Sequence, residues 1–168
     1  MKSFRFLLGF ALIGLLITLS GCPGNKDPEL TVPQQQNKKL AKAWVCTAAT
    51  LDGSAASLPA PSTYTYVGNF KLTMVGATGT DATAGPTYTT AGRPTGSKVT
   101  PWNSTGSFTF GTDAATTLIR EDGIIVSYSV SDTQLQMSFN TGGKTPPFAG
   151  YDGRVGNVQG NWVFTFGL

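Results

Sequence analysis

After residue 39, this sequence consists mainly of short segments in which apolar and polar side chains alternate, and this feature constrains the fold more than any other. Phe70, Leu72 and Met74, for example, alternate with Lys71 and Thr73. A period of two places the apolar side chains on one face of a β-strand, whereas an amphipathic helix needs a period near 3.6. The clearest segments are residues 44–48, 70–74, 107–110, 124–130, 134–139 and 162–166.

Strands with one apolar and one polar face bury a single face, which is typical of antiparallel sheets. About eight such strands joined by turns form a barrel or a sandwich. Turns are predicted at residues 111–113 and 121–123, and Ser131-Asp132 predicts a tight hairpin. We therefore expect an all-β fold, an antiparallel up-and-down barrel, with longer connections at residues 76–106 and 140–160.

The first 21 residues have the features of a secretory signal peptide. An apolar run over residues 6–19 follows a short basic start and is shorter than the ~20 residues that a membrane-spanning helix needs. It ends in Leu19, Ser20, Gly21 and Cys22, which resemble the lipobox of bacterial lipoproteins. We expect cleavage before Cys22, acylation of the Cys22 thiol and attachment to a membrane through this lipid.

Residues 22–38 are polar, contain three prolines and a Gln run, and show no apolar periodicity. This composition predicts a lipidated flexible tether, which leaves residues 39–168 as the folded body. Residue 23 is Pro, not the Asp that retains lipoproteins at the inner membrane in some Gram-negative bacteria. We therefore expect attachment to the outer membrane, and the periplasmic and the surface-facing leaflet remain alternatives.

The charge and composition exclude several classes of function. Only 12% of the residues are charged, and the chain without its signal peptide has a net charge of about +1, too small for a nucleic-acid binder. The absence of His removes the commonest general base and metal ligand. The nine carboxylates are scattered, and the adjacent pair Glu121-Asp122 is interpreted as solvated turn residues. We expect neither catalysis, nor a metal, nor a cofactor.

Three short segments resemble the lipocalin-like lipoproteins of Bacteroidetes-type bacteria. They are residues 40–45, the Asp52-Gly53 pair and residues 160–166, and the resemblance extends over about residues 38–168. Lys42 stands where the Gly-x-Trp motif of lipocalins has its Gly. The resemblance implies an eight-stranded up-and-down barrel that can hold a small apolar ligand.

The apolar face of the predicted strands supplies the candidate ligand-binding residues. An eight-stranded barrel is either filled by side chains or holds one small ligand, and both interpretations remain open. The residues proposed to contact a hydrophobic or amphipathic ligand inside the barrel are Phe70, Leu72, Met74, Phe108, Phe110, Tyr128, Met137 and Phe139. Cys46 is in phase with Trp44 and is interpreted as a small buried hydrophobic residue.

Trp102 differs from the other tryptophans because it follows Pro101 in a predicted loop. Its indole could stack on a sugar ring, cap the mouth of the barrel or fold back onto the domain. These possibilities support two alternatives to a ligand-binding barrel: a surface module that binds glycans or proteins, and a structural lipoprotein of the cell envelope. The oligomeric state stays open.

The lipobox generates a prediction about processing. We expect Cys22→Ala to accumulate as an unprocessed precursor, because the variant lacks the thiol that is acylated. Intact-mass analysis measures this directly. A wild-type protein that retains residues 1–21 would contradict the assignment.

Overall fold

The computed structural model describes residues 29–56, 64–77, 84–94, 100–142 and 159–168. The chain divides into two units, residues 1–30 and 31–168, and the fold described below is that of the second unit. The predicted signal peptide, Cys22 and much of the two longer connections lie outside the described residues. Among the described residues, no helix is long and apolar enough to cross a membrane.

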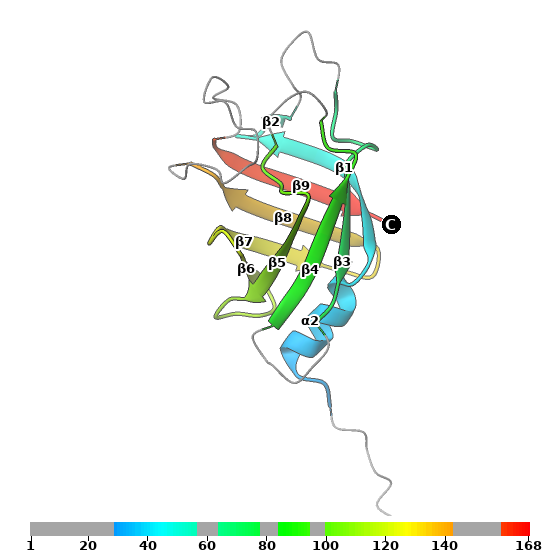
Figure 1. Ribbon diagram of the computed structural model, residues 1–168, viewed down its shortest axis with the longest axis vertical. Coiled ribbons are helices and arrows are strands. Elements are labelled where there is room, and N and C mark those ends of the chain that lie inside the picture. The colour runs from blue at the N-terminus through cyan, green and yellow to red at the C-terminus, as the bar shows by residue number, and fades with distance from the viewer. Residues whose placement is uncertain (1–28, 57–63, 78–83, 95–99, 143–158) are drawn as a thin grey trace, which may run out of the picture. The chain divides into compact units, whose positions relative to one another are not determined.

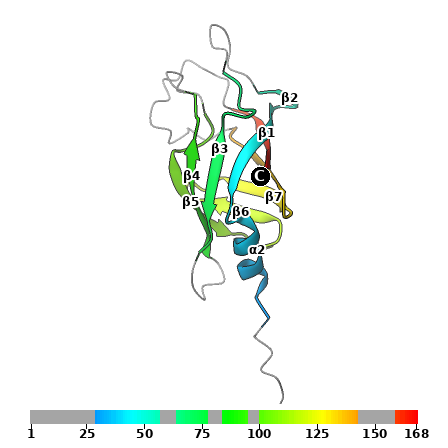
Figure 2. The same cartoon turned by 90° about the vertical axis from the view of Figure 1, so that its right-hand side faces the viewer.

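The described part of the chain contains nine strands in one antiparallel sheet (Figures 1 and 2). They are β1 (Ala43–Leu51), β2 (Ser54–Ala55), β3 (Lys71–Val75), β4 (Ala84–Ala91), β5 (Thr105–Phe110), β6 (Thr117–Arg120), β7 (Ile125–Val130), β8 (Gln134–Asn140) and β9 (Asn161–Gly167). Strands β3 to β9 pair in chain order, and β1 pairs with both β3 and β9. The sheet is therefore a closed eight-stranded barrel with β2 as an additional short strand, which confirms the predicted all-β barrel.

Strand β1 closes the barrel because it divides its length between two neighbours. Ala43–Val45 pair with β3, and Val45–Leu51 pair with β9. The β1–β9 register shifts between Cys46 and Ala48, as in a β-bulge, which bends a strand and increases its local twist. This bend lets one strand complete both sides of the ring.

The alternation of the sequence appears directly in the burial of the strands. In β8, Leu135, Met137 and Phe139 are buried, while Gln134 and Gln136 are exposed. The connection between β7 and β8 is the predicted tight hairpin, in which the Ser131 N–H donates to the Gln134 carbonyl at 2.8 Å. The apolar faces of the strands thus form one continuous interior core.

A helix lies at one end of the barrel. Helix α2 (Val32–Leu40) includes seven residues of the predicted tether, and for these residues the expectation of a flexible segment is wrong. The Thr31 N–H donates to Gln34 Oε1 at 2.9 Å, and a proline in the first turn favours helix initiation. Asn37 then donates through Nδ2 to the Ala84 carbonyl at 2.9 Å, so the barrel itself holds the helix.

The opposite end of the barrel is called the mouth. Among the described residues it includes the β1–β2 turn at Asp52-Gly53, the segment Thr100–Asn103 between β4 and β5, and the turn Glu121–Gly123 between β6 and β7. The backbone N–H of Asp52 donates to the Asn161 carbonyl at 2.9 Å, which extends the β1–β9 pairing to this end.

Trp44 is predicted to be essential for stability. Its side chain is 0% exposed, it lies in phase with buried Cys46, and its Nε1–H donates to the Leu40 carbonyl at 2.9 Å. Because Trp44→Ala removes a fully buried aromatic ring that links α2 to β1, we expect a loss of about 3–5 kcal/mol in the free energy of unfolding. Urea denaturation measures it.

Val75→Ala provides the control for Trp44→Ala. Val75 is 61% exposed on the outer face of β3, so its truncation should change the free energy of unfolding by less than about 0.5 kcal/mol. Equal effects of the two substitutions would contradict the assignment of Trp44 to the core.

Candidate functional site

All eight residues proposed to line the barrel interior are buried. Each is at most 6% exposed. Met74, Phe110 and Tyr128 lie toward the α2 end of their strands, where the Tyr128 hydroxyl donates to the Ala114 carbonyl. Phe70 and Phe139 lie nearer the mouth, and both contact the ring of Trp102. The structure therefore brings only part of the predicted set together at one location.

Cys46 is also buried, as predicted, at 1% exposure. Burial raises the pKa of its thiol to about 11, and a backbone hydrogen bond at Ala48 offsets this only in part. Because the thiolate is the reactive form of cysteine, Cys46 is inert at neutral pH and serves as a packing residue.

Trp102 lies inside the mouth and is 0% exposed. Its indole is surrounded by four aromatic rings, which we call the aromatic cage: Phe70 at 6.0 Å, Tyr88 at 5.7 Å, Phe139 at 5.4 Å and Phe164 at 5.7 Å between ring centroids. Three of the four rings meet the indole edge to face, a favourable geometry for aromatic pairs. An exposed Trp102 that stacks on a sugar is therefore excluded, and the indole plugs the barrel instead.

The predicted ligand-contacting set lacks Tyr88, Phe164 and Arg120 of this site, and the charged member among them is Arg120. It is the last residue of β6 and only 1% exposed. Its Cζ lies 5.7 Å from the ring centroid of Trp102 and 5.5 Å from that of Phe139, within the range of cation–π attraction. A signal was present, because the period of two places Arg120 on the same face as buried Leu118.

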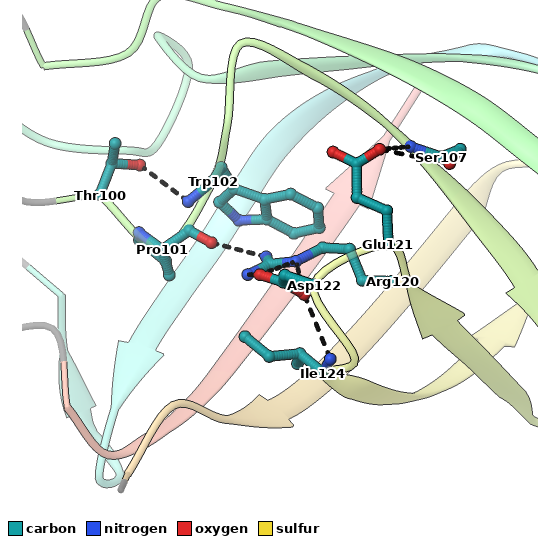
Figure 3. A network of polar contacts seen from close by, with 8 residues as sticks. All are labelled: Thr100, Pro101, Trp102, Ser107, Arg120, Glu121, Asp122 and Ile124. Carbon is teal, nitrogen blue, oxygen red and sulfur yellow. Dashed lines mark hydrogen bonds and ion pairs between the residues drawn. The ribbon is translucent and has the colours of Figure 1, made fainter. Parts of the chain in front are cut away.

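Asp122 neutralises the buried guanidinium (Figure 3). Arg120 donates from Nε to Asp122 Oδ1 at 2.9 Å and from Nη2 to Oδ2 at 2.5 Å. The side chain of Asp122 is only 7% exposed, so its interpretation as a solvated turn acid is wrong. The physical reason is that a buried charge needs a partner, and the turn returns Asp122 to the side chain two residues before it.

The same guanidinium holds the backbone of the plug. Arg120 Nη1 donates to the Pro101 carbonyl at 2.6 Å, directly before Trp102 (Figure 3). The Trp102 N–H donates to Thr100 Oγ1 at 3.3 Å. Glu121, by contrast, is exposed and accepts from the Ser107 N–H at 3.2 Å. The turn between β6 and β7 therefore positions the Trp102 segment through one buried ion pair.

Two polar atoms in the mouth lack a hydrogen-bond partner. They are Trp102 Nε1 and Tyr88 Oη. Among the described residues, one further buried side-chain atom has no partner, Gln36 Oε1 of α2. A buried donor or acceptor without a partner costs about 1–3 kcal/mol, and such atoms are uncommon in native proteins. The mouth thus combines an apolar cage with unused hydrogen-bonding capacity.

The ring of Tyr88 packs closely over Gly106, its partner on β5. A Cβ on Gly106 would lie 2.5 Å from the Tyr88 hydroxyl, so a larger residue there would force the ring to move. Desolvation raises the pKa of Tyr88 to about 12, while Arg120 lowers it in part. The hydroxyl is therefore protonated at neutral pH and can both donate and accept a hydrogen bond.

No protein-family model matches this chain, and no curated protein or solved structure shows significant similarity to it. Among the described residues, no group of three or more Cys, Asp or Glu side chains is arranged to hold a metal ion. The candidate site therefore rests on its own geometry: an aromatic cage, its Trp102 plug and the Arg120–Asp122 pair.

The Arg120–Asp122 pair generates a stability prediction. Asp122→Ala leaves the guanidinium buried without its counter-charge, so we expect a loss of about 3–5 kcal/mol in the free energy of unfolding. The double variant Arg120→Met/Asp122→Ala removes both charges and should be more stable than Asp122→Ala alone. Urea denaturation of the three proteins checks this order, and a cost below about 1 kcal/mol for Asp122→Ala would contradict the pairing.

Proposed function

We propose that this chain is a lipid-anchored, non-enzymatic envelope protein whose barrel binds a small, flat, mainly apolar molecule in the aromatic cage. The ligand would take the place of the Trp102 indole. The observation that carries the proposal is that a side chain from a connecting segment, not from a strand, fills the cage while its Nε1–H stays unpaired.

The unpaired Nε1–H makes the plug weaker than its ring contacts alone indicate. In the cage this donor has no partner, whereas in water it would be hydrogen-bonded. This difference lowers the free-energy cost of moving the indole out of the cage by about 1–3 kcal/mol. A ligand of similar shape without a buried, unpaired donor would occupy the cage at no such cost.

The location of Trp102 also favours exchange over rigid packing. Phe139 and Phe164 belong to β8 and β9 and could leave the interior only if the strand pairing broke. Trp102 lies between β4 and β5, where the side chains of Arg120 and Thr100 hold its backbone. Segments of this kind open locally at a lower free energy than the strands of a core.

The predicted anchor would keep the barrel close to the outer membrane. Nine residues, 23–31, separate Cys22 from the start of α2 and reach at most about 30 Å when extended. A lipid on Cys22 would therefore limit how far the barrel can move from the membrane surface.

The proposal narrows the predicted ligand-contacting set. Phe70 and Phe139 contact the plug and would contact a ligand in its place. The other six predicted residues would act as core that shapes the barrel, because they are buried elsewhere in the interior or behind the cage. The alternative is a structural lipoprotein whose barrel is permanently filled by its own side chains. The following experiment distinguishes this alternative from a ligand-binding barrel.

Naphthalene, which has the size and flatness of the indole, tests the proposal. Burying about 200 Å² of apolar ligand surface contributes about 5 kcal/mol before the costs of association, so a high-micromolar dissociation constant is the tightest that we expect for saturable binding of one naphthalene to the full chain. Trp102→Ala removes the competing plug and should bind naphthalene at least about tenfold more tightly, since the cage is then vacant. Equilibrium dialysis measures both affinities.

Trp162→Ala is the matched control, because Trp162 is 3% exposed and stacks on Phe164 but is a residue of β9 outside the cage. It should not bind naphthalene more tightly than the wild type. No saturable binding to the folded wild type would favour the structural alternative. Equal tightening by both Trp→Ala substitutions would contradict the assignment of Trp102 as the plug.

A further inference from the structure

We propose that the cage selects a neutral ligand that carries a hydrogen-bonding oxygen, such as a ketone, ester or alcohol, and that Tyr88 Oη recognises this oxygen. The inference rests on the proposed function and goes beyond it by assigning the chemical class of the ligand and the residue that determines it.

Tyr88 has unused hydrogen-bonding capacity. Its side chain is 2% exposed, and its hydroxyl has no hydrogen-bond partner. The ring lies 5.7 Å from the indole of Trp102, edge to face, and 5.0 Å from the ring of Phe108. A ligand in the place of Trp102 therefore contacts the Tyr88 ring, and an oxygen on the rim of the ligand would supply the partner that the hydroxyl lacks.

The described charges that act on the Tyr88 hydroxyl are balanced in number. They are two cations, Arg120 and Arg93, and two anions, Glu121 and Asp122, from the neighbouring elements. This set does not single out an anionic ligand. A neutral ligand fits this environment without any change in protonation.

Arg120 is the cation that contacts the cage. Its Nε and Nη2 donate to Asp122, and its Nη1 donates to the Pro101 carbonyl. A carboxylate ligand would add a second negative charge beside a guanidinium whose charge Asp122 already balances. Burying that extra charge costs more than burying a neutral oxygen that is hydrogen-bonded.

Three ligands with one naphthalene ring system separate these effects: naphthalene, 2-acetylnaphthalene and 2-naphthoate. For the full-length wild type at pH 7, we expect 2-acetylnaphthalene to bind about fivefold more tightly than naphthalene, because it gains one hydrogen bond. The anion 2-naphthoate should bind at least about tenfold more weakly than 2-acetylnaphthalene. Equilibrium dialysis gives the three dissociation constants.

Tyr88→Phe tests the assigned residue. It removes the hydroxyl but keeps the ring, so the preference for 2-acetylnaphthalene over naphthalene should disappear while naphthalene affinity stays within about twofold. Tyr128→Phe is the matched control, since Tyr128 is buried at 5% exposure but its hydroxyl donates to the Ala114 carbonyl toward the α2 end. This variant should keep the preference.

The outcomes distinguish the inference from the proposed function. If naphthalene binds but 2-naphthoate binds most tightly, or if Tyr88→Phe keeps the preference for the ketone, the selection of a neutral oxygen by Tyr88 is overturned and the ligand-binding cage stands. If none of the three ligands binds the folded wild type, both proposals are overturned.

Discussion

The pairing of β1 with β9 is the constraint on which the rest of the structure depends. It turns a row of strands into a closed ring, removes two exposed edges and sets the direction in which every interior side chain points. Phe166 and Phe164 of β9 become buried opposite Cys46 and Ala49 of β1 only because this pairing exists. The aromatic cage follows from it, because its rings come from elements that are far apart in the sequence.

The two ends of the ring differ in how they hold a tryptophan. At the α2 end, Trp44 belongs to a strand and its Nε1–H donates to the Leu40 carbonyl. At the mouth, Trp102 belongs to a connecting segment and its Nε1–H is unpaired. Both indoles are 0% exposed. Burial alone therefore does not distinguish a core residue from a plug, whereas the hydrogen bonding and the backbone context do.

The strands, the turns and the burial of Trp44 and Cys46 could be predicted because a period of two is a local pattern. Helix α2 was missed: the capping pair Thr31 and Gln34 is present in the sequence, but the helix is mostly polar and depends on contacts with the barrel, including the hydrogen bond from Asn37 to Ala84. The burial of Asp122 likewise depends on its pairing with Arg120. Because Arg120 is charged, the alternation of β6 does not by itself include it among the buried residues. The insertion of Trp102 has no periodic signal, because connecting segments have none.

Hydrogen exchange of the tryptophan indole Nε1–H groups, followed by NMR on the wild type, tests the central claim that Trp102 is a displaceable plug. Because the Trp102 segment opens locally while Trp44 is released only on global unfolding, the account predicts that the Trp102 indole exchanges at least about a hundredfold faster than that of Trp44. If both indoles exchange at the single slow rate of global unfolding, Trp102 is a fixed part of the core and the account is contradicted.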